Sequence, residues 1–255
     1  MKQTNNPILT PNQITMIGLI LTLALFCGWF LIDGLIVPWL VCAGFILVHL
    51  GDFLDGIVAR RYQMQSMLGI YFDPAVDHIS YAALTILMID AGLLPVWFLF
   101  IFILANTAAG FVKNFAAGNN RVVSASLLAK VKTDLVFVPL ACLFFIHNAP
   151  QEWQLFIVLG IGLFWLTIKY VFGASEKHTL AMRIATAIFT LAFLLRPNGI
   201  DIPEYYTILY LALAIVSIVG SAAFYFWDNR DLFRSSSIAK DPNLSTNQEL
   251  GAVGK

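Results

Sequence analysis

The chain has 255 residues, of which 59% are hydrophobic and 12% charged, and its mean hydropathy is +0.80. Ordinary soluble domains carry about 25% charged residues, so this composition excludes a water-soluble fold of this size. The formal net charge is zero, and the clustered Lys and Arg of a nucleic-acid-binding protein are missing. Cys27, Cys42 and Cys142 lie in apolar runs without metal-ligand spacing, which predicts neither a disulfide framework nor a zinc site.

Apolar stretches recur along the chain, each close to the length of about 20 residues that a helix needs to cross a bilayer. Residues that break helices, mainly Gly, Pro and Asn, separate most of them. We expect eight membrane helices, near Ile14–Leu31, Leu35–Ala59, Ile70–Met88, Pro95–Ala116, Val131–Ile146, Trp153–Phe172, Leu180–Leu195 and Tyr205–Phe226. The predicted fold is therefore an all-α integral membrane protein. Residues 235–255 are polar without periodicity, and we expect them to be disordered.

The distribution of cations predicts the orientation of these helices. If both termini are cytosolic, 14 of the 15 Lys and Arg residues fall in cytosolic segments, and only Arg196 lies outside. Loops on the cytosolic side of membrane proteins carry an excess of Lys and Arg. The pattern therefore favours an even number of spans, with both ends of the chain in the cytosol.

Four carboxylates occupy positions where membrane helices rarely carry charge, since a carboxylate inside the bilayer is costly and usually functional. Asp52 and Asp55 lie in the second predicted helix, and Asp73 and Asp77 lie in the third. At about 100° per residue, each pair forms a stripe on one face of its helix. The short polar link between the helices would bring the stripes face to face near the cytosolic surface. Carboxylates that converge repel one another unless cations lie between them, and oxygen ligands suit Mg²⁺ and Mn²⁺.

Each of these residues has an ordinary interpretation when it is taken alone. Membrane carboxylates also serve as proton relays or pair helices, and glycines in membrane helices usually allow close packing. Residues 52–77 together, however, read D-x2-D-G-x2-A-R-x8-G-x3-D-x3-D, and a chance match is on the order of 10⁻¹⁰ per start point. This string resembles the signature of the CDP-alcohol phosphatidyltransferase family, whose members transfer a phosphatidyl group from CDP-diacylglycerol to an alcohol and release CMP.

The resemblance implies roles for the matching positions. Metal ions, two Mg²⁺ or Mn²⁺, would be bound by Asp52, Asp55, Asp73 and Asp77. Asp77 would also be the catalytic base that takes the proton of the acceptor hydroxyl. The CDP moiety would lie along Gly56, Ala59 and Gly69, with Arg60 near its phosphates. Just before the first helix, residues 11–15 read PNQIT and resemble the P-N-x-[IL]-T segment of the family, which adds Asn12 and Thr15 to the CDP site.

The family resemblance also divides the chain. Residues 1–173 would form the six-helix core, residues 174–230 two additional membrane helices, and residues 231–255 a cytosolic tail. It implies a multi-pass protein of the cell inner (plasma) membrane whose site faces the cytosol. Its partners would be CDP-diacylglycerol, a small polar alcohol, the lipid bilayer and a second copy in a homodimer, with no nucleic acid.

One segment bears on the acceptor alcohol. Residues 124–133, SASLLAKVKT, resemble the S-A-S-x-x-G-K-x-K-T stretch of bacterial phosphatidylglycerophosphate synthases, with Ala129 in place of the glycine. The resemblance implies an acceptor site formed by Ser126, Lys130, Lys132 and Thr133, and glycerol 3-phosphate as the acceptor. Alternatively, the lysines are positive-inside anchors, and the acceptor is serine, choline, ethanolamine or inositol phosphate.

Two unrelated functions also fit parts of the sequence. A membrane prenyltransferase binds Mg²⁺-diphosphate through acid clusters, but its two acidic motifs lie far apart in sequence, whereas here they fall within residues 52–77. A transporter with a cation site would show paired repeats and broken helices, and we find no convincing internal repeat.

Overall fold

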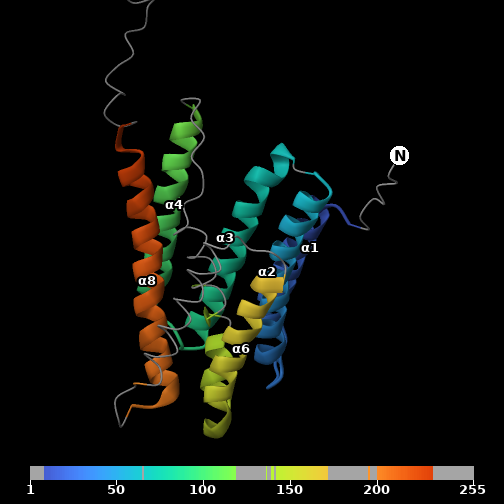
Figure 1. Ribbon diagram of the computed structural model, residues 1–255. Helices are drawn as coiled ribbons and strands as arrows, with labels where there is room; N and C mark the ends of the chain where they lie inside the picture. The colour runs from blue at the N-terminus through green and yellow to red at the C-terminus, as the bar shows by residue number, and fades with distance from the viewer. Residues whose placement is uncertain are drawn as a thin grey trace, which may run out of the picture.

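The fold was obtained as a computed structural model, which describes residues 9–64, 66–118, 136, 139–140, 142–171, 195 and 200–231. Within these ranges all regular structure is helical, as predicted. The long helices are α1 (Pro11–Leu31), α2 (Val37–Arg61), α3 (Met67–Asp90), α4 (Val96–Gly118), α6 (Gln151–Val171) and α8 (Ile202–Asp228). They stand roughly side by side as an elongated bundle (Figure 1).

Four of these helices are long and apolar enough to cross a membrane: α1, α2 from Val37 to Ala59, α4 to Ala116, and α8. The class of protein, an all-α multi-pass membrane protein, is therefore confirmed. The total of eight spans stays a prediction, because the stretch Leu180–Leu195 lies outside the described residues, Leu195 excepted, and so does part of Val131–Ile146.

The helices place the cytosolic ends predicted from the charges on one side of the bundle. The link between α2 and α3 and the ends of α4 and α8 lie toward the top of Figure 1, the start of α1 lies somewhat lower in the same half, and the end of α6 lies near mid-height. Among the cations there are Arg61, Lys113 and Arg230. This common side is what the charge pattern predicts, since each crossing reverses the chain direction.

A ladder of polar contacts fixes α1 against α3. Along α1, Thr15, Thr22 and Trp29 recur at intervals of seven residues, which keeps them on one side of a helix that packs at a shallow angle. Their partners on α3 are, in the same order, Asp73 at 3.1 Å, Ser80 at 2.8 Å and Asp90 at 2.8 Å. These contacts set the position of α3 along α1 over most of its length.

Helix α1 also packs closely on α2 because Gly44 of α2 has no side chain. A Cβ atom at this position would lie 2.6 Å from Cδ1 of Leu25 on α1. Small residues at such contacts let membrane helices approach and gain dispersion energy. Helices α1, α2 and α3 therefore form one compact unit.

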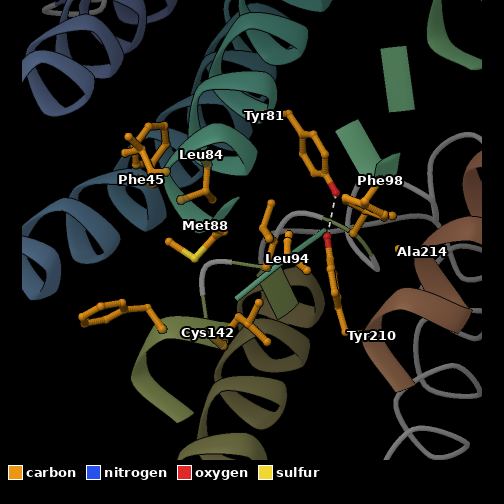
Figure 2. Close-up of a cluster of buried hydrophobic side chains, with 14 of the residues drawn as sticks. Phe45, Tyr81, Leu84, Met88, Leu94, Phe98, Cys142, Tyr210 and Ala214 are labelled. Carbon is orange, nitrogen blue, oxygen red and sulfur yellow. Dashed lines mark hydrogen bonds between the residues drawn. The ribbon is translucent and has the colours of Figure 1, made fainter. Parts of the chain in front are cut away.

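The main apolar core joins this unit to α4 and α8. Its fully buried members include Phe45 of α2, Leu84 and Met88 of α3, Phe98 of α4 and Tyr210 of α8 (Figure 2). On α3 the core occupies the second half of the helix, from Tyr81 to Met88. The first half of α3, with Asp73 and Asp77, is thus left for polar chemistry.

Candidate active site

The four aspartates converge at the end of the α2–α3 hairpin. Asp52 and Asp55 lie in the last turns of α2, and Asp73 and Asp77 lie in the first turns of α3. The carboxyl group of Asp77 lies within electrostatic reach of Asp52, Asp55 and Asp73, and within hydrogen-bonding reach of Asp52. The structure therefore brings together the two stripes that the sequence places on separate helices.

Thr15 of α1 completes this cluster. Its hydroxyl oxygen Oγ1 lies 2.8 Å from Oδ2 of Asp55 and 3.1 Å from Oδ1 of Asp73. It also lies 3.1 Å from the backbone oxygen of Pro11. A hydroxyl has one proton to donate, so it can satisfy only one of these three acceptors at a time. The site thus holds more oxygen acceptors than protons. Because Thr15 is only 5% and Asp55 only 3% exposed, water has little access to these oxygens.

This excess of oxygens matches the chemistry of a hard divalent cation. Carboxylate and hydroxyl oxygens are ligands that Mg²⁺ and Mn²⁺ accept. Among the described residues no three acidic, His or Cys side chains form a ready-made metal site. Mg²⁺ commonly takes only one or two carboxylates and completes its shell with water and substrate phosphates. The residues present therefore fit a metal that binds together with a diphosphate, rather than a closed structural metal site.

A second polar group surrounds Gly69 at the start of α3. Ser66 is the N-cap of this helix, and its Oγ accepts a hydrogen bond from the backbone nitrogen of Gly69 at 3.0 Å. The same Oγ donates to Oδ1 of Asn12 at 3.2 Å. A Cβ atom at position 69 would lie 3.2 Å from that Asn12 oxygen and 3.6 Å from Oδ2 of Asp73. Asn12, Ser66 and Gly69 thus form one unit beside the carboxylates, and a Cβ atom at position 69 would be tightly packed against Asn12.

The structure describes some of the remaining predicted site residues and leaves others undescribed. Gly56 and Ala59 lie half-buried on α2, one and four residues after Asp55. Arg60 is within α2, but its side chain is outside the described part of the structure. The predicted acceptor residues Ser126, Lys130, Lys132 and Thr133 are also outside it. The roles of all these residues stay predictions.

Sequence reasoning missed Ser66 and the direct contact of Thr15 with two aspartates. Ser66 carried a local signal, because serine just before a helix is a preferred N-cap. Nothing in the local sequence predicted its hydrogen bond with Asn12, which is 54 residues away.

His78, next to Asp77, is exposed and lies edge-on to the Phe102 ring.

The protein is thus a multi-pass membrane protein in which the α2–α3 hairpin gathers aspartates, and an Asn and a Thr from α1 close the site. A family model described as CDP-alcohol phosphatidyltransferase matches residues 8–171. This range is well over half of the chain, and the protein belongs to the CDP-alcohol phosphatidyltransferase family. It is therefore a transferase of phospholipid biosynthesis, as the motif predicted.

Similar proteins from distant organisms share one functional name. A protein of Bacillus subtilis (strain 168) named CDP-diacylglycerol–glycerol-3-phosphate 3-phosphatidyltransferase is 28% identical over 134 residues, covering 52% of this chain and 68% of its own. The protein of that name from Rickettsia typhi is 27% identical over 133 residues, or 52% of this chain and 74% of its own. The protein of Arabidopsis thaliana named CDP-diacylglycerol–glycerol-3-phosphate 3-phosphatidyltransferase 2 is 24% identical over 179 residues, or 65% of this chain and 76% of its own.

Proposed function

We propose that this enzyme transfers the phosphatidyl group of CDP-diacylglycerol to glycerol 3-phosphate, with release of CMP. We choose glycerol 3-phosphate as the acceptor because the similar proteins from three distant organisms are named for it. The two lysines and the hydroxyl residues at 126–133 support it, because a phosphorylated acceptor needs cationic and hydrogen-bonding partners.

The chemistry proposed for the aspartates follows from their positions. Asp77 takes the proton of the acceptor hydroxyl, whose oxygen forms a new bond to the phosphorus that carries diacylglycerol. The bond from that phosphorus to the oxygen of CMP breaks, and CMP leaves with the electron pair. Asp77 fits the role of base because it lies on α3 one turn after Asp73, beside the proposed metal site, where an acceptor hydroxyl would meet the donor phosphate.

Asp52, Asp55 and Asp73 would hold the divalent cations, Mg²⁺ or Mn²⁺. When bound, such ions neutralise the diphosphate and stabilise the charge on the leaving CMP. Thr15 holds Asp55 and Asp73 in place from α1. Gly69, with Asn12 and Ser66 beside it, would lie along the cytidine. Arg60, four residues beyond Gly56, would reach the phosphates.

The proposed setting is the inner (plasma) membrane, with the aspartates at the cytosolic face, where water-soluble glycerol 3-phosphate is available. The position of Arg61, Lys113 and Arg230 at the same end of the bundle as the aspartates supports this orientation. We also propose that the enzyme acts as a homodimer.

The direct test measures CMP release by the purified enzyme in detergent, with CDP-diacylglycerol and Mg²⁺ or Mn²⁺. Glycerol 3-phosphate, serine, inositol 1-phosphate, choline and ethanolamine are supplied one at a time. We expect turnover with glycerol 3-phosphate alone; turnover with another acceptor instead would reassign the substrate. EDTA should stop the reaction and added Mg²⁺ or Mn²⁺ restore it, whereas full activity in EDTA would exclude the metal.

Two substitutions on α3 separate catalysis from folding. Asp77→Asn should abolish turnover. Asp90→Asn is the matched control, because Asp90 lies at the opposite end of the same helix, bonded to Trp29. It should leave kcat near the wild-type value. If Asp77→Asn turns over at a rate close to that of wild type, Asp77 is not the catalytic base.

A further inference from the structure

Helix α8 lies outside the part of the chain that matches the family, residues 8–171, yet it reaches the helix that carries two of the aspartates. The hydroxyl groups of Tyr210 on α8 and Tyr81 on α3 lie 2.8 Å apart. Tyr81 is 6% and Tyr210 1% exposed. Figure 2 shows the two rings approaching each other end-on from their separate helices, with the bond between their hydroxyls.

Aromatic packing fixes both rings in this arrangement. The Tyr81 ring stacks on Phe102 of α4, with centroids 4.1 Å apart and an interplanar angle of 26°. Tyr210 packs against Phe98, one turn earlier on α4, at 5.7 Å. Helices α4 and α8 also pack extensively against each other. The contact between the tyrosines is therefore held by three helices, and neither ring can turn without displacing a neighbour.

Tyr81 is coupled to the active site through its own helix. It follows Asp77 by four residues, one helical turn, and so lies on the same face about 6 Å further along the axis. About 80° around α3 from Tyr81, Asp73 accepts a hydrogen bond from Thr15 of α1. Helix α3 is thus held by α1 at Asp73 and by α8 at Tyr81. A change in its rotation at Tyr81 would move the carboxyl group of Asp77.

We propose that Tyr210 is a positioning residue for catalysis: through its hydrogen bond to Tyr81 it sets the rotation of α3 and hence the position of the Asp77 carboxyl group. Helix α8 is then part of the catalytic unit rather than an appendage to it. The inference rests on the proposed role of Asp77 as the base.

The test uses the full-length enzyme and conservative substitutions that remove a single hydroxyl. Tyr210→Phe and Tyr81→Phe should each lower kcat roughly five- to tenfold, because small displacements of a catalytic group are costly. The KM for CDP-diacylglycerol should change less than about twofold, since the donor site lies toward α1 and α2. The double variant should be no slower than either single variant, because both remove the same bond.

Tyr206→Phe is the matched control. Tyr206 lies one turn earlier on α8, is 2% exposed, and donates its hydroxyl to the backbone oxygen of Pro139 at 3.0 Å. This variant also loses a buried hydrogen bond, but one that does not involve α3. We expect lower thermal stability with wild-type kcat at a temperature well below unfolding.

Three results would overturn the inference: wild-type kcat in Tyr210→Phe, an equal loss of kcat in Tyr206→Phe, or additive losses in the double variant. If Tyr210→Phe does not fold, the kcat of Tyr81→Phe is the test instead, and a wild-type kcat in that variant would overturn the inference. Asp77→Asn is measured alongside. Near-wild-type turnover of that variant would refute the base itself, whatever the tyrosine variants show.

Discussion

The hydroxyl of Thr15 offers the sharpest test of the carboxylate cluster. Thr15→Val keeps the shape of the side chain and removes the group that lies between Asp55 and Asp73. The hydroxyl has one proton, so the variant loses one charge-assisted hydrogen bond rather than three. Such a bond contributes about 1.5–3 kcal/mol. At about 1.36 kcal/mol for each factor of ten, kcat/KM should fall roughly 10- to 150-fold.

The assay is CMP release with CDP-diacylglycerol and the acceptor that supports turnover. Thr15→Ser retains the hydroxyl and should remain within about threefold of wild type. Thr22→Val is the matched control. It makes the same change seven residues further along α1, where the hydroxyl bonds to Ser80 at 2.8 Å, away from the aspartates. It should lower thermal stability while changing kcat/KM less than about threefold.

Two results would refute this reasoning. The first is a Thr15→Val enzyme within about threefold of wild type, which would mean that the two carboxylates are held without the hydroxyl. The second is an equal loss of kcat/KM in Thr22→Val, which would show that any break in the α1–α3 ladder has the same effect.

Three further predictions concern the predicted cytidine surface at Gly69, the α1–α2 contact at Gly44 and the end of the bundle at which α8 begins. In Gly69→Ala the added Cβ lies 3.2 Å from Oδ1 of Asn12, so Asn12 must shift. The loss of one Asn12 contact with the donor, about 1 kcal/mol, should raise the KM for CDP-diacylglycerol roughly fivefold. An unchanged KM would contradict the predicted cytidine surface. Gly44→Ala should lower the free energy of unfolding by about 1 kcal/mol in thermal unfolding. In a Leu25→Ala background the same substitution should cause no loss, since the clash is with the Leu25 side chain. Equal losses in the wild-type and Leu25→Ala backgrounds would exclude this contact as the cause. Burial lowers the pKa of His147, which contacts Thr207 at 2.8 Å, so the unfolded chain takes up the proton first and stability falls as pH drops below the ordinary value of about 6.5. His147→Gln should flatten that slope in pH-dependent unfolding, and an unaltered slope would assign it to another group.

Composition and local pattern were sufficient for the class of protein, the helices and the acidic motif. Each of the six long helices lies within three residues of its predicted bounds at both ends, as Pro11–Leu31 against Ile14–Leu31 illustrates. A helix satisfies its backbone within its own segment, and the bilayer demands such helices of apolar composition. The spacing of Asp52, Asp55, Asp73 and Asp77 also places each pair on one helix face. For these reasons the chemistry of the site could be predicted before any fold was known.

What the tertiary structure alone decided is which helix faces which. Thr15 contacts Asp73 across 58 residues, Ser66 contacts Asn12 across 54, and Tyr81 contacts Tyr210 across 129. Helical periodicity shows which side chains share a face, but not the neighbour onto which that face packs, because packing depends on the shapes of both helices. The aspartates were therefore visible in the sequence. The hydroxyl groups that hold them in place, one of them on a helix beyond the family core, emerged only when the bundle was assembled.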